Sequence, residues 1–299
     1  MGKTAFVFAG QGAQTPGMGA DLYAEKSTAK KYFDMLSDEL KSLIFNGPGE
    51  ELSKTINAQP AIFAMNLACA ELLTENGVKP DGLAGFSFGE VTALVYAKTL
   101  SITDGLEYTL KRAEYMQVAS NNTSSGMLTV LKLQPEKIED ICNETGKAWP
   151  ANYNSEEQTV VAFDKTNELE LTEKLKEAGG RVMPLSVSGA FHSPIMESAA
   201  SNALEYLSKI SLKSPEYPVY ANLTAFPYTD DVAKYMSEQI KSPVLWFKTI
   251  QNMITDGYDT FIEAGPGKTL TGLIKRVNKD VRLFNVNSVS SLEETLQNL

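Results

Sequence analysis

The stretch GLAGFSFGEVTAL, residues 82–94, places the pattern Gly-x-Ser-x-Gly between a short apolar run and a helical pattern. We expect a strand at 82–86 and a helix at 89–99. Glycines on both sides of Ser87 would permit a strained turn that lifts its hydroxyl out of the sheet, where it could act as a nucleophile. The alternative is an ordinary turn in which Ser87 caps the helix and Glu90 complements the helix dipole.

Apolar runs alternate with helical patterns in the regions flanking this turn, which favours an α/β fold with a mainly parallel sheet. Residues 4–8 are expected to form a buried strand, and residues 258–267 a strand followed by a turn. Further helices are expected at 60–76, 103–119 and 268–277.

The middle of the chain has a different order of elements: strand, helix, strand, strand, helix, strand. The strands are expected at 127–133, 147–152, 158–163 and 181–187, and the helices at 135–145 and 167–178. This βαββαβ order is typical of a ferredoxin-like unit. We therefore expect a small ferredoxin-like subdomain at 124–187, inserted into a larger α/β-hydrolase-like subdomain formed by 1–123 and 188–299.

Composition excludes some classes of function. A net charge of −10 over 299 residues disfavours nonspecific nucleic-acid binding. The apolar runs are too short for a membrane span. Cys69 and Cys142 lie far apart inside helical patterns, so we expect buried free thiols and a cytoplasmic protein.

His192, in VSGAFHSPIM at 187–196, is the only histidine of the chain. A serine nucleophile needs a base, and if Ser87 is one, this is the only imidazole available. The order, Ser before His, agrees with α/β-hydrolase-like proteins. The group that would orient the ring stays open, because many carboxylates or a backbone carbonyl could serve.

The glycine-rich run GQGAQTPGMG, residues 10–19, follows the first expected strand. It misses the dinucleotide-binding fingerprint because Thr15 occupies the position of the last glycine, and it lacks the Lys-Ser/Thr of a phosphate-binding loop. Two interpretations remain: a loop whose backbone N–H groups approach a ligand, or a turn-rich connection.

Together these segments resemble the malonyl-CoA:acyl-carrier-protein transacylases of fatty-acid synthesis and the acyltransferase domains of polyketide synthases. The resemblance covers nearly the whole chain. It depends on ordered motifs: GQGAQ at 10–14, GFSFGE at 85–90, Arg112 in LKRAEYM, GAFHS at 189–193 and EAGPGKTLTGL at 263–273.

The resemblance implies a role for each matching position. Ser87 would take the acyl group, and His192 would act as general base and then as general acid. The backbone N–H groups of Gln11 and Phe88 would form the oxyanion hole. The backbone carbonyl of Gln239 would orient the histidine ring.

Substrate-binding residues are implied in the same way. Arg112 would hold the free carboxylate of malonyl through its guanidinium fork; without the resemblance, an Arg on a solvated helix face would be favoured. Met116, Asn152 and Asn154 would line the same site. The chain departs from many members at Phe86, where they have His before the nucleophile.

The expected activity is ping-pong transfer of malonyl from malonyl-CoA to the phosphopantetheine thiol of acyl carrier protein, in fatty-acid biosynthesis. No metal or other cofactor is expected, since coenzyme A enters as substrate. A monomer with no nucleic-acid or membrane partner is expected. The alternatives are a malonyltransferase serving a polyketide synthase, a serine thioesterase or hydrolase, and a catalytically silent acyl-CoA-binding module.

Overall fold

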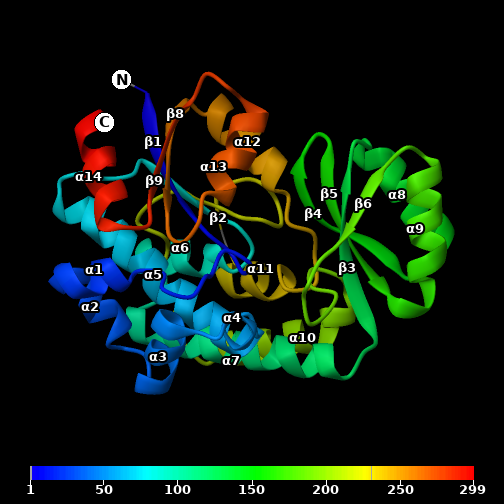
Figure 1. Ribbon diagram of the computed structural model, residues 1–299, viewed down its shortest axis with the longest axis horizontal. Coiled ribbons are helices and arrows are strands. Elements are labelled where there is room, and N and C mark those ends of the chain that lie inside the picture. Colours follow the sequence, from blue (N-terminus) through cyan, green and yellow to red (C-terminus); the bar gives the residue numbers. More distant parts are fainter. Residues whose placement is uncertain (1, 230) are drawn as a thin grey trace.

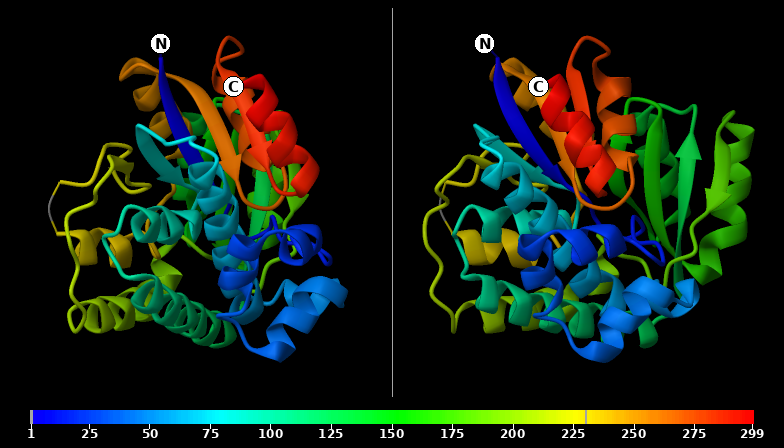
Figure 2. Two further views of the ribbon diagram at one scale, coloured as in Figure 1. Left: turned by 90° about the vertical axis from the view of Figure 1, so that its left-hand side faces the viewer. Right: turned by 60° about the vertical axis from the view of Figure 1, so that its left-hand side comes forward.

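The structure is a computed structural model that describes residues 2–229 and 231–299. Figures 1 and 2 show two parts of unequal size. The larger part is a helix-covered parallel sheet that carries both ends of the chain. The smaller part, green in Figure 1, is an antiparallel sheet with two helices on one face.

The parallel sheet of the larger part has the strand order β7-β2-β1-β8-β9. Each neighbouring pair in it is parallel. The strands are β1 (Lys3–Phe8), β2 (Gly82–Gly85), β7 (Val219–Tyr220), β8 (Tyr258–Ala264) and β9 (Arg282–Val286). Because all strands point the same way, the loops after β1, β2 and β7 meet at one edge, where ligands bind in open α/β sheets.

Helices cover both faces of this sheet. In chain order they are α1 (Ala20–Glu25), α2 (Ser27–Phe33), α3 (Asp38–Asn46), α4 (Gly49–Leu52), α5 (Thr55–Glu75), α6 (Gly89–Tyr96), α7 (Ile102–Asn121), η2 (Pro194–Met196, a 3₁₀ turn), α10 (Glu197–Leu207), α11 (Val232–Glu238), α12 (Trp246–Thr255), α13 (Thr269–Val277) and α14 (Val289–Asn298). No helix in the described ranges is both long and apolar enough to cross a membrane.

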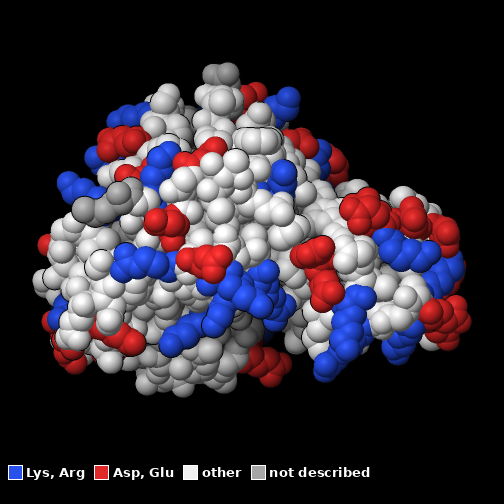
Figure 3. All heavy atoms as spheres, turned by 90° about the horizontal axis from the view of Figure 1, so that it is seen from above, with Lys and Arg blue, Asp and Glu red and all other residues white. Residues whose placement is uncertain are grey.

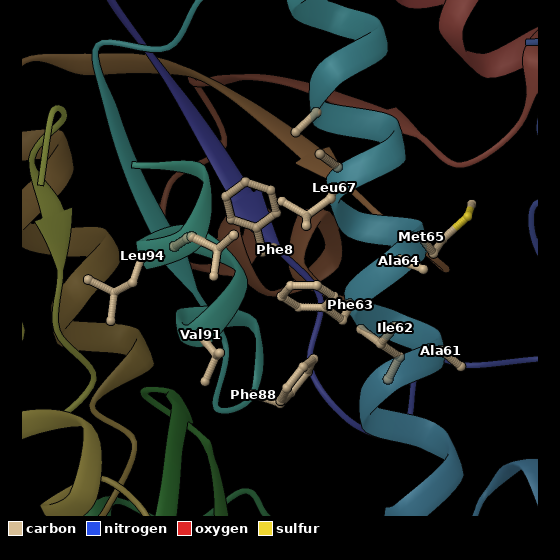
Figure 4. Close-up of a cluster of buried hydrophobic side chains, with 14 of the residues drawn as sticks. Phe8, Ala61, Ile62, Phe63, Ala64, Met65, Leu67, Phe88, Val91 and Leu94 are labelled. Carbon is tan, nitrogen blue, oxygen red and sulfur yellow. The ribbon is translucent and has the colours of Figure 1, made fainter. Parts of the chain in front are cut away.

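Side chains of β1 alternate between two hydrophobic clusters, as the period of a strand requires. Phe6 and Phe8 belong to the cluster formed with α5 and α6, whereas Ala5 and Val7 belong to the one formed with α12 and α13. Figure 4 shows the first cluster, with Phe8 lying between the side chains of α5 and α6. Burial on both faces explains why the strand is apolar from Ala5 to Phe8.

The smaller part has the strand order β4-β5-β3-β6, with every neighbouring pair antiparallel. Its elements are β3 (Ser125–Leu131), α8 (Pro135–Thr145), β4 (Ala148–Ser155), β5 (Gln158–Asp164), η1 (Lys165–Asn167, a 3₁₀ turn), α9 (Glu168–Glu177) and β6 (Arg181–Pro184). This order confirms the predicted fold class, a parallel α/β part with a ferredoxin-like unit. The domain boundaries, 1–123 with 188–299 and 124–187, stay a prediction.

Several local predictions were wrong in detail. The helix expected from Pro60 begins at Thr55, with Pro60 inside it; the burial of most of its residues offsets the backbone hydrogen bond that proline cannot donate. The strand expected at 181–187 ends at Pro184. Cys69 and Cys142 are buried and free, as expected.

Candidate active site

The nucleophile turn between β2 and α6 is tightly packed. Ser87 has φ +52°, in the left-handed region that residues with a side chain rarely adopt. A Cβ on Gly85 would overlap the backbone of Gly89 and Glu90, and a Cβ on Gly89 would overlap the carbonyl of Phe8. The Gly-x-Ser-x-Gly pattern is therefore a steric requirement of this turn.

Ser87 does not cap the helix, so the alternative interpretation of the turn is wrong. The N-cap position of α6 is Phe88, and it makes no side-chain cap. The Ser87 hydroxyl instead lies 2.6 Å from Nε2 of His192. Their sequence positions are 105 residues apart, and the fold brings them together.

The imidazole of His192 is held on its other side by Gln239. Nδ1 lies 2.8 Å from the backbone carbonyl oxygen of Gln239. A carbonyl oxygen can only accept, so the proton of a neutral ring is on Nδ1 and Nε2 presents its lone pair to Ser87. The structure thus places Gln239 where the resemblance implied, with a carbonyl in the position that a triad carboxylate occupies in other serine enzymes.

The electrostatic surroundings keep His192 neutral. Burial, and after it the positive charge of Arg112, lower its pKa to about 4, although the hydrogen bond to the Gln239 carbonyl acts in the opposite direction. Near pH 7 the ring therefore holds a free lone pair and is ready to accept the proton of Ser87.

The expected oxyanion donors lie in the loop after β1 and in the turn after β2. A Cβ on Gly10 would overlap the carbonyl of Phe86, so this glycine lets the two segments pack together. Within residues 2–229 and 231–299, the backbone N–H groups of Gln11 and Phe88 have no hydrogen-bond acceptor. The Phe88 side chain is buried in the cluster shown in Figure 4, which fixes the backbone just after Ser87.

Arg112 of α7 is 1% exposed, so the alternative of a solvated helix face is wrong. Its Nη2 donates to Oε1 of Gln239 at 3.0 Å, and its guanidinium lies 5.8 Å from the ring centroid of Phe88. In the described part of the chain, Nε and Nη1 have no hydrogen-bond partner and no carboxylate pairs with this cation. A buried, incompletely paired guanidinium is costly by itself and favours an anionic ligand.

Two buried polar residues behind the nucleophile were not predicted as site residues from the sequence, where Glu90 was interpreted only as a charge that complements the helix dipole. Asn222, which follows β7, accepts the backbone N–H of Ser87 at 2.7 Å. Glu90 is 2% exposed and accepts the backbone N–H of Asn222 at 2.6 Å and the hydroxyl of Tyr228. Burial raises the pKa of Glu90 to about 7. A polar residue directly after an apolar strand pattern was the available signal for Asn222.

A cavity of about 400 Å³ lies between the two parts of the molecule, and Figure 3 shows the surface hollowed between them. From the larger part it is lined by Gln11, Ser87, Arg112, Met116 and His192, and from β4 by Asn152 and Asn154. The predicted substrate residues thus surround one space, with Phe88 and Gln239 behind its wall.

The lining of this cavity includes both apolar and polar side chains, of which Phe86 and Asn154 are examples. The Phe86 ring lies edge-on against Trp246, with 5.5 Å between centroids, and forms an apolar wall beside Ser87. Oδ1 of Asn154, which also lines the cavity, is buried and has no partner among the described residues. The site therefore combines an apolar wall with polar groups that are free to meet a ligand.

This arrangement can perform nucleophilic acyl chemistry. A serine hydroxyl bonded to a neutral imidazole, free backbone donors beside it and a buried cation in the same cavity suit the transfer of an acyl group that carries a negative charge. The fold and the geometry together define a serine acyltransferase type of site.

Comparisons with known proteins agree with this class. The family model described as acyl transferase domain matches residues 5–293. A malonyl CoA-acyl carrier protein transacylase of Bacillus subtilis (strain 168) is 38% identical, over 100% of this chain and 98% of that protein. The crystal structure of a transacylase of the same name from Clostridium perfringens has a TM-score of 0.95 at 37% identity, covering 99% of this chain and 96% of that one.

A further solved structure is a malonyl-transacylase in complex with a type II polyketide synthase acyl-carrier protein, with 32% identity and a TM-score of 0.95, covering 99% of this chain and 100% of that chain. The chain therefore belongs to the acyl transferase domain family and, within it, to the malonyl CoA-acyl carrier protein transacylases.

Proposed function

We propose that this protein transfers a malonyl group from malonyl-CoA to the phosphopantetheine thiol of acyl carrier protein through a malonyl ester of Ser87. The observation that carries the proposal is one cavity that holds both the Ser87–His192 pair and the incompletely bonded guanidinium of Arg112. The names of the relatives at 32–38% identity support the same reaction.

In the first half of the reaction, Nε2 of His192 takes the hydroxyl proton as Ser87 attacks the thioester carbonyl. The carbonyl oxygen becomes negative and receives hydrogen bonds from the backbone N–H groups of Gln11 and Phe88. As the tetrahedral intermediate collapses, the C–S bond breaks and His192 returns the proton to the leaving thiolate of coenzyme A. The carbonyl of Gln239 stabilises the imidazolium that forms in between.

The second half runs the same steps with a different nucleophile. His192 takes the proton of the phosphopantetheine thiol, and the thiolate attacks the ester carbonyl at Ser87. Collapse of the second intermediate breaks the C–O bond, and His192 protonates the serine. The backbone donors stabilise the oxyanion and His192 transfers the proton, so the proposed steps do not require a metal. No electrons are gained or lost, so they need no redox cofactor, and coenzyme A takes part as a substrate.

Arg112 selects the acyl group in this proposal. Its free nitrogens would receive the distal carboxylate of malonyl in charge-assisted hydrogen bonds. Acetyl lacks that carboxylate and leaves the cation unpaired. Met116, Asn152 and Asn154 would line the remaining surface of the bound group.

The setting of the reaction is part of the same proposal. We propose a cytoplasmic monomer that serves fatty-acid biosynthesis. A carrier from a type II polyketide pathway is the second candidate, because one relative of similar identity is a malonyl-transacylase in complex with such a carrier.

The test is a steady-state assay with labelled malonyl-CoA and purified holo acyl carrier proteins of both pathways. The proposal expects malonyl-carrier as the main product, with the preferred carrier formed at the higher kcat/KM. Free malonate as the main product with every carrier would contradict it and indicate a hydrolase, because an ester meant for transfer must resist water.

A further inference from the structure

We propose that Asn222 and Glu90 form a buried brace that positions Ser87 for attack. The brace consists of these two residues: Glu90 fixes Asn222, and Asn222 fixes the main chain of the nucleophile turn. The inference rests on the proposed function, since it assigns positioning residues to the same nucleophile. Neither residue lines the cavity, so neither is a catalytic residue.

Asn222 holds the turn at two points. Its Oδ1 accepts the backbone N–H of Ser87 at 2.7 Å, and its Nδ2 donates to the carbonyl of Gly85 at 2.6 Å. Ser87 has an unfavourable φ of +52°, which persists only where the surroundings hold it. The fully buried amide of Asn222 supplies such a hold.

The same contact decides which backbone groups can bind an oxyanion. The N–H of Ser87 is already donated to Asn222, so it is not free to stabilise the negative oxygen. The neighbouring N–H groups of Gln11 and Phe88 remain for that purpose. By occupying one donor, the brace also sets the side of the turn on which the oxyanion forms.

Glu90 fixes Asn222 through its backbone. Its Oε2 accepts the Asn222 N–H at 2.6 Å, and its other oxygen accepts the hydroxyl of Tyr228. The Asn222 carbonyl in turn accepts the N–H of Leu245 at 3.0 Å. Because Glu90 lies in the first turn of α6 and Asn222 follows β7, the strand that neighbours β2, the brace connects the helix after the nucleophile to the segment after β7.

Gln239 joins this arrangement to the rest of the site. Its side-chain Nε2 donates to the carbonyl of Ser87 at 2.7 Å and lies 3.4 Å from Oδ1 of Asn222. Its backbone carbonyl holds His192. A shift of Asn222 would therefore change the distance between the serine hydroxyl and the imidazole, on which proton transfer depends.

The experiment measures the reactivity of Ser87 without using malonyl. The probe is a small alkyl fluorophosphonate, which lacks a carboxylate and so does not depend on Arg112. The Ser87 Oγ–P bond forms, the P–F bond breaks, fluoride leaves and His192 takes the hydroxyl proton. The full-length variants Asn222→Ala, Glu90→Ala and Glu90→Gln are compared with the wild type by the second-order rate of labelling.

Asn167→Ala is the matched control. The Asn167 amide also donates to two backbone carbonyls, those of Thr145 and Gly146, but it lies in the smaller part of the molecule. Loss of comparable hydrogen bonds there should leave the labelling rate unchanged. Thermal unfolding of every variant identifies any chain that does not fold.

The brace predicts that Asn222→Ala and Glu90→Ala lower the labelling rate by about tenfold to a hundredfold, as misplacement of a reacting group does. Glu90→Gln should restore most of the rate, because its amide can accept the Asn222 N–H and donate to Tyr228. Wild-type rates in folded Asn222→Ala, or equal rates in the two Glu90 variants, would overturn the brace. If Asn222→Ala does not fold, the comparison of Glu90→Ala with Glu90→Gln tests the proposal.

The proposed function can be contradicted without contradicting the brace. A wild-type chain that reacts with the fluorophosphonate but takes no malonyl group would contradict the proposed function, while slow labelling of the brace variants would still support the brace. A wild-type chain that the fluorophosphonate does not label at Ser87 would overturn both.

Discussion

The two parts of the molecule contribute to the cavity in different ways. The larger part supplies Ser87, His192, Arg112 and Gln239, which are joined by hydrogen bonds and held by a buried polar network. The smaller part supplies mainly Asn152, Asn154 and apolar side chains such as that of Met127. No hydrogen bond joins those asparagine side chains to the catalytic groups within the described residues.

The two parts of the molecule are connected by backbone hydrogen bonds near the site. Strand β4 is attached to the larger part through backbone bonds between Val244 and its neighbours Ala151 and Tyr153. Val244 is followed by Leu245, whose N–H bonds to Asn222. The reacting groups therefore all belong to the larger part, and the smaller part completes the lining of the substrate cavity. Substitutions in the first should change the chemical step, and those in the second should change binding.

The largest effect is expected for His192→Ala. Without the base, acylation of Ser87 by malonyl-CoA should slow by about three to four orders of magnitude, the upper range of what general acid–base catalysis contributes. The overall rate of malonyl transfer to the carrier should be no slower in the double variant Ser87→Ala/His192→Ala than in either single variant, because the pair acts as a unit. Rapid-quench kinetics measure this, and independent, multiplying effects would contradict the assignment.

Arg112→Ala should have the second largest effect on activity. Loss of the charged hydrogen bonds is expected to lower kcat/KM for malonyl-CoA by about a hundredfold or more, while acetyl-CoA turnover stays constant or rises. Arg112→Lys is the matched variant, since it keeps the charge and loses the planar fork. Competition between the two thioesters measures the preference, and unchanged selectivity in Arg112→Ala would remove the role given to this residue.

A pH profile tests the electrostatic coupling within the larger part. The pKa of His192 is lowered to about 4, first by burial and then by Arg112. Fluorophosphonate labelling of the wild type should therefore stay constant from neutral pH to well below pH 6 and fall only near pH 4. In Arg112→Ala the imidazolium loses a repelling charge, so its pKa rises and the fall should move to higher pH. A profile that does not move would contradict the coupling.

The smallest effect is expected in the smaller part. Asn152→Ala and Asn154→Ala should each raise KM for malonyl-CoA about three- to tenfold, the equivalent of one hydrogen bond, with kcat nearly unchanged. Steady-state kinetics separate the two constants. A large fall in kcat with constant KM would break the division of roles between the parts.

Features encoded locally could be predicted from the sequence. The nucleophile turn follows from glycines on both sides of Ser87, and the ferredoxin-like unit follows from alternating strand and helix patterns with turn residues between them. His192 could be identified as the candidate base because the chain holds no other histidine. In each case the information lies within a few residues or in the composition.

Features that depend on contacts between distant segments were not predictable. Asn222 and Ser87 are 135 residues apart, and no local pattern links them. Glu90 has a sufficient local explanation as a charge at a helix N-terminus, and only the fold shows that its carboxylate is buried. Arg112 lies among polar residues, yet α5, α6 and α10 all pack against its helix and exclude water.

The central claim is that one buried site uses Ser87 to take a carboxylated acyl group. Intact-protein mass spectrometry after brief mixing with malonyl-CoA or acetyl-CoA, without carrier protein and followed by peptide mapping, tests it most directly. The account predicts a malonyl adduct on the Ser87 peptide, far stronger than any acetyl adduct and absent from Ser87→Ala. An equally strong adduct in Ser87→Ala, or the absence of any adduct or turnover in the wild type, would contradict it.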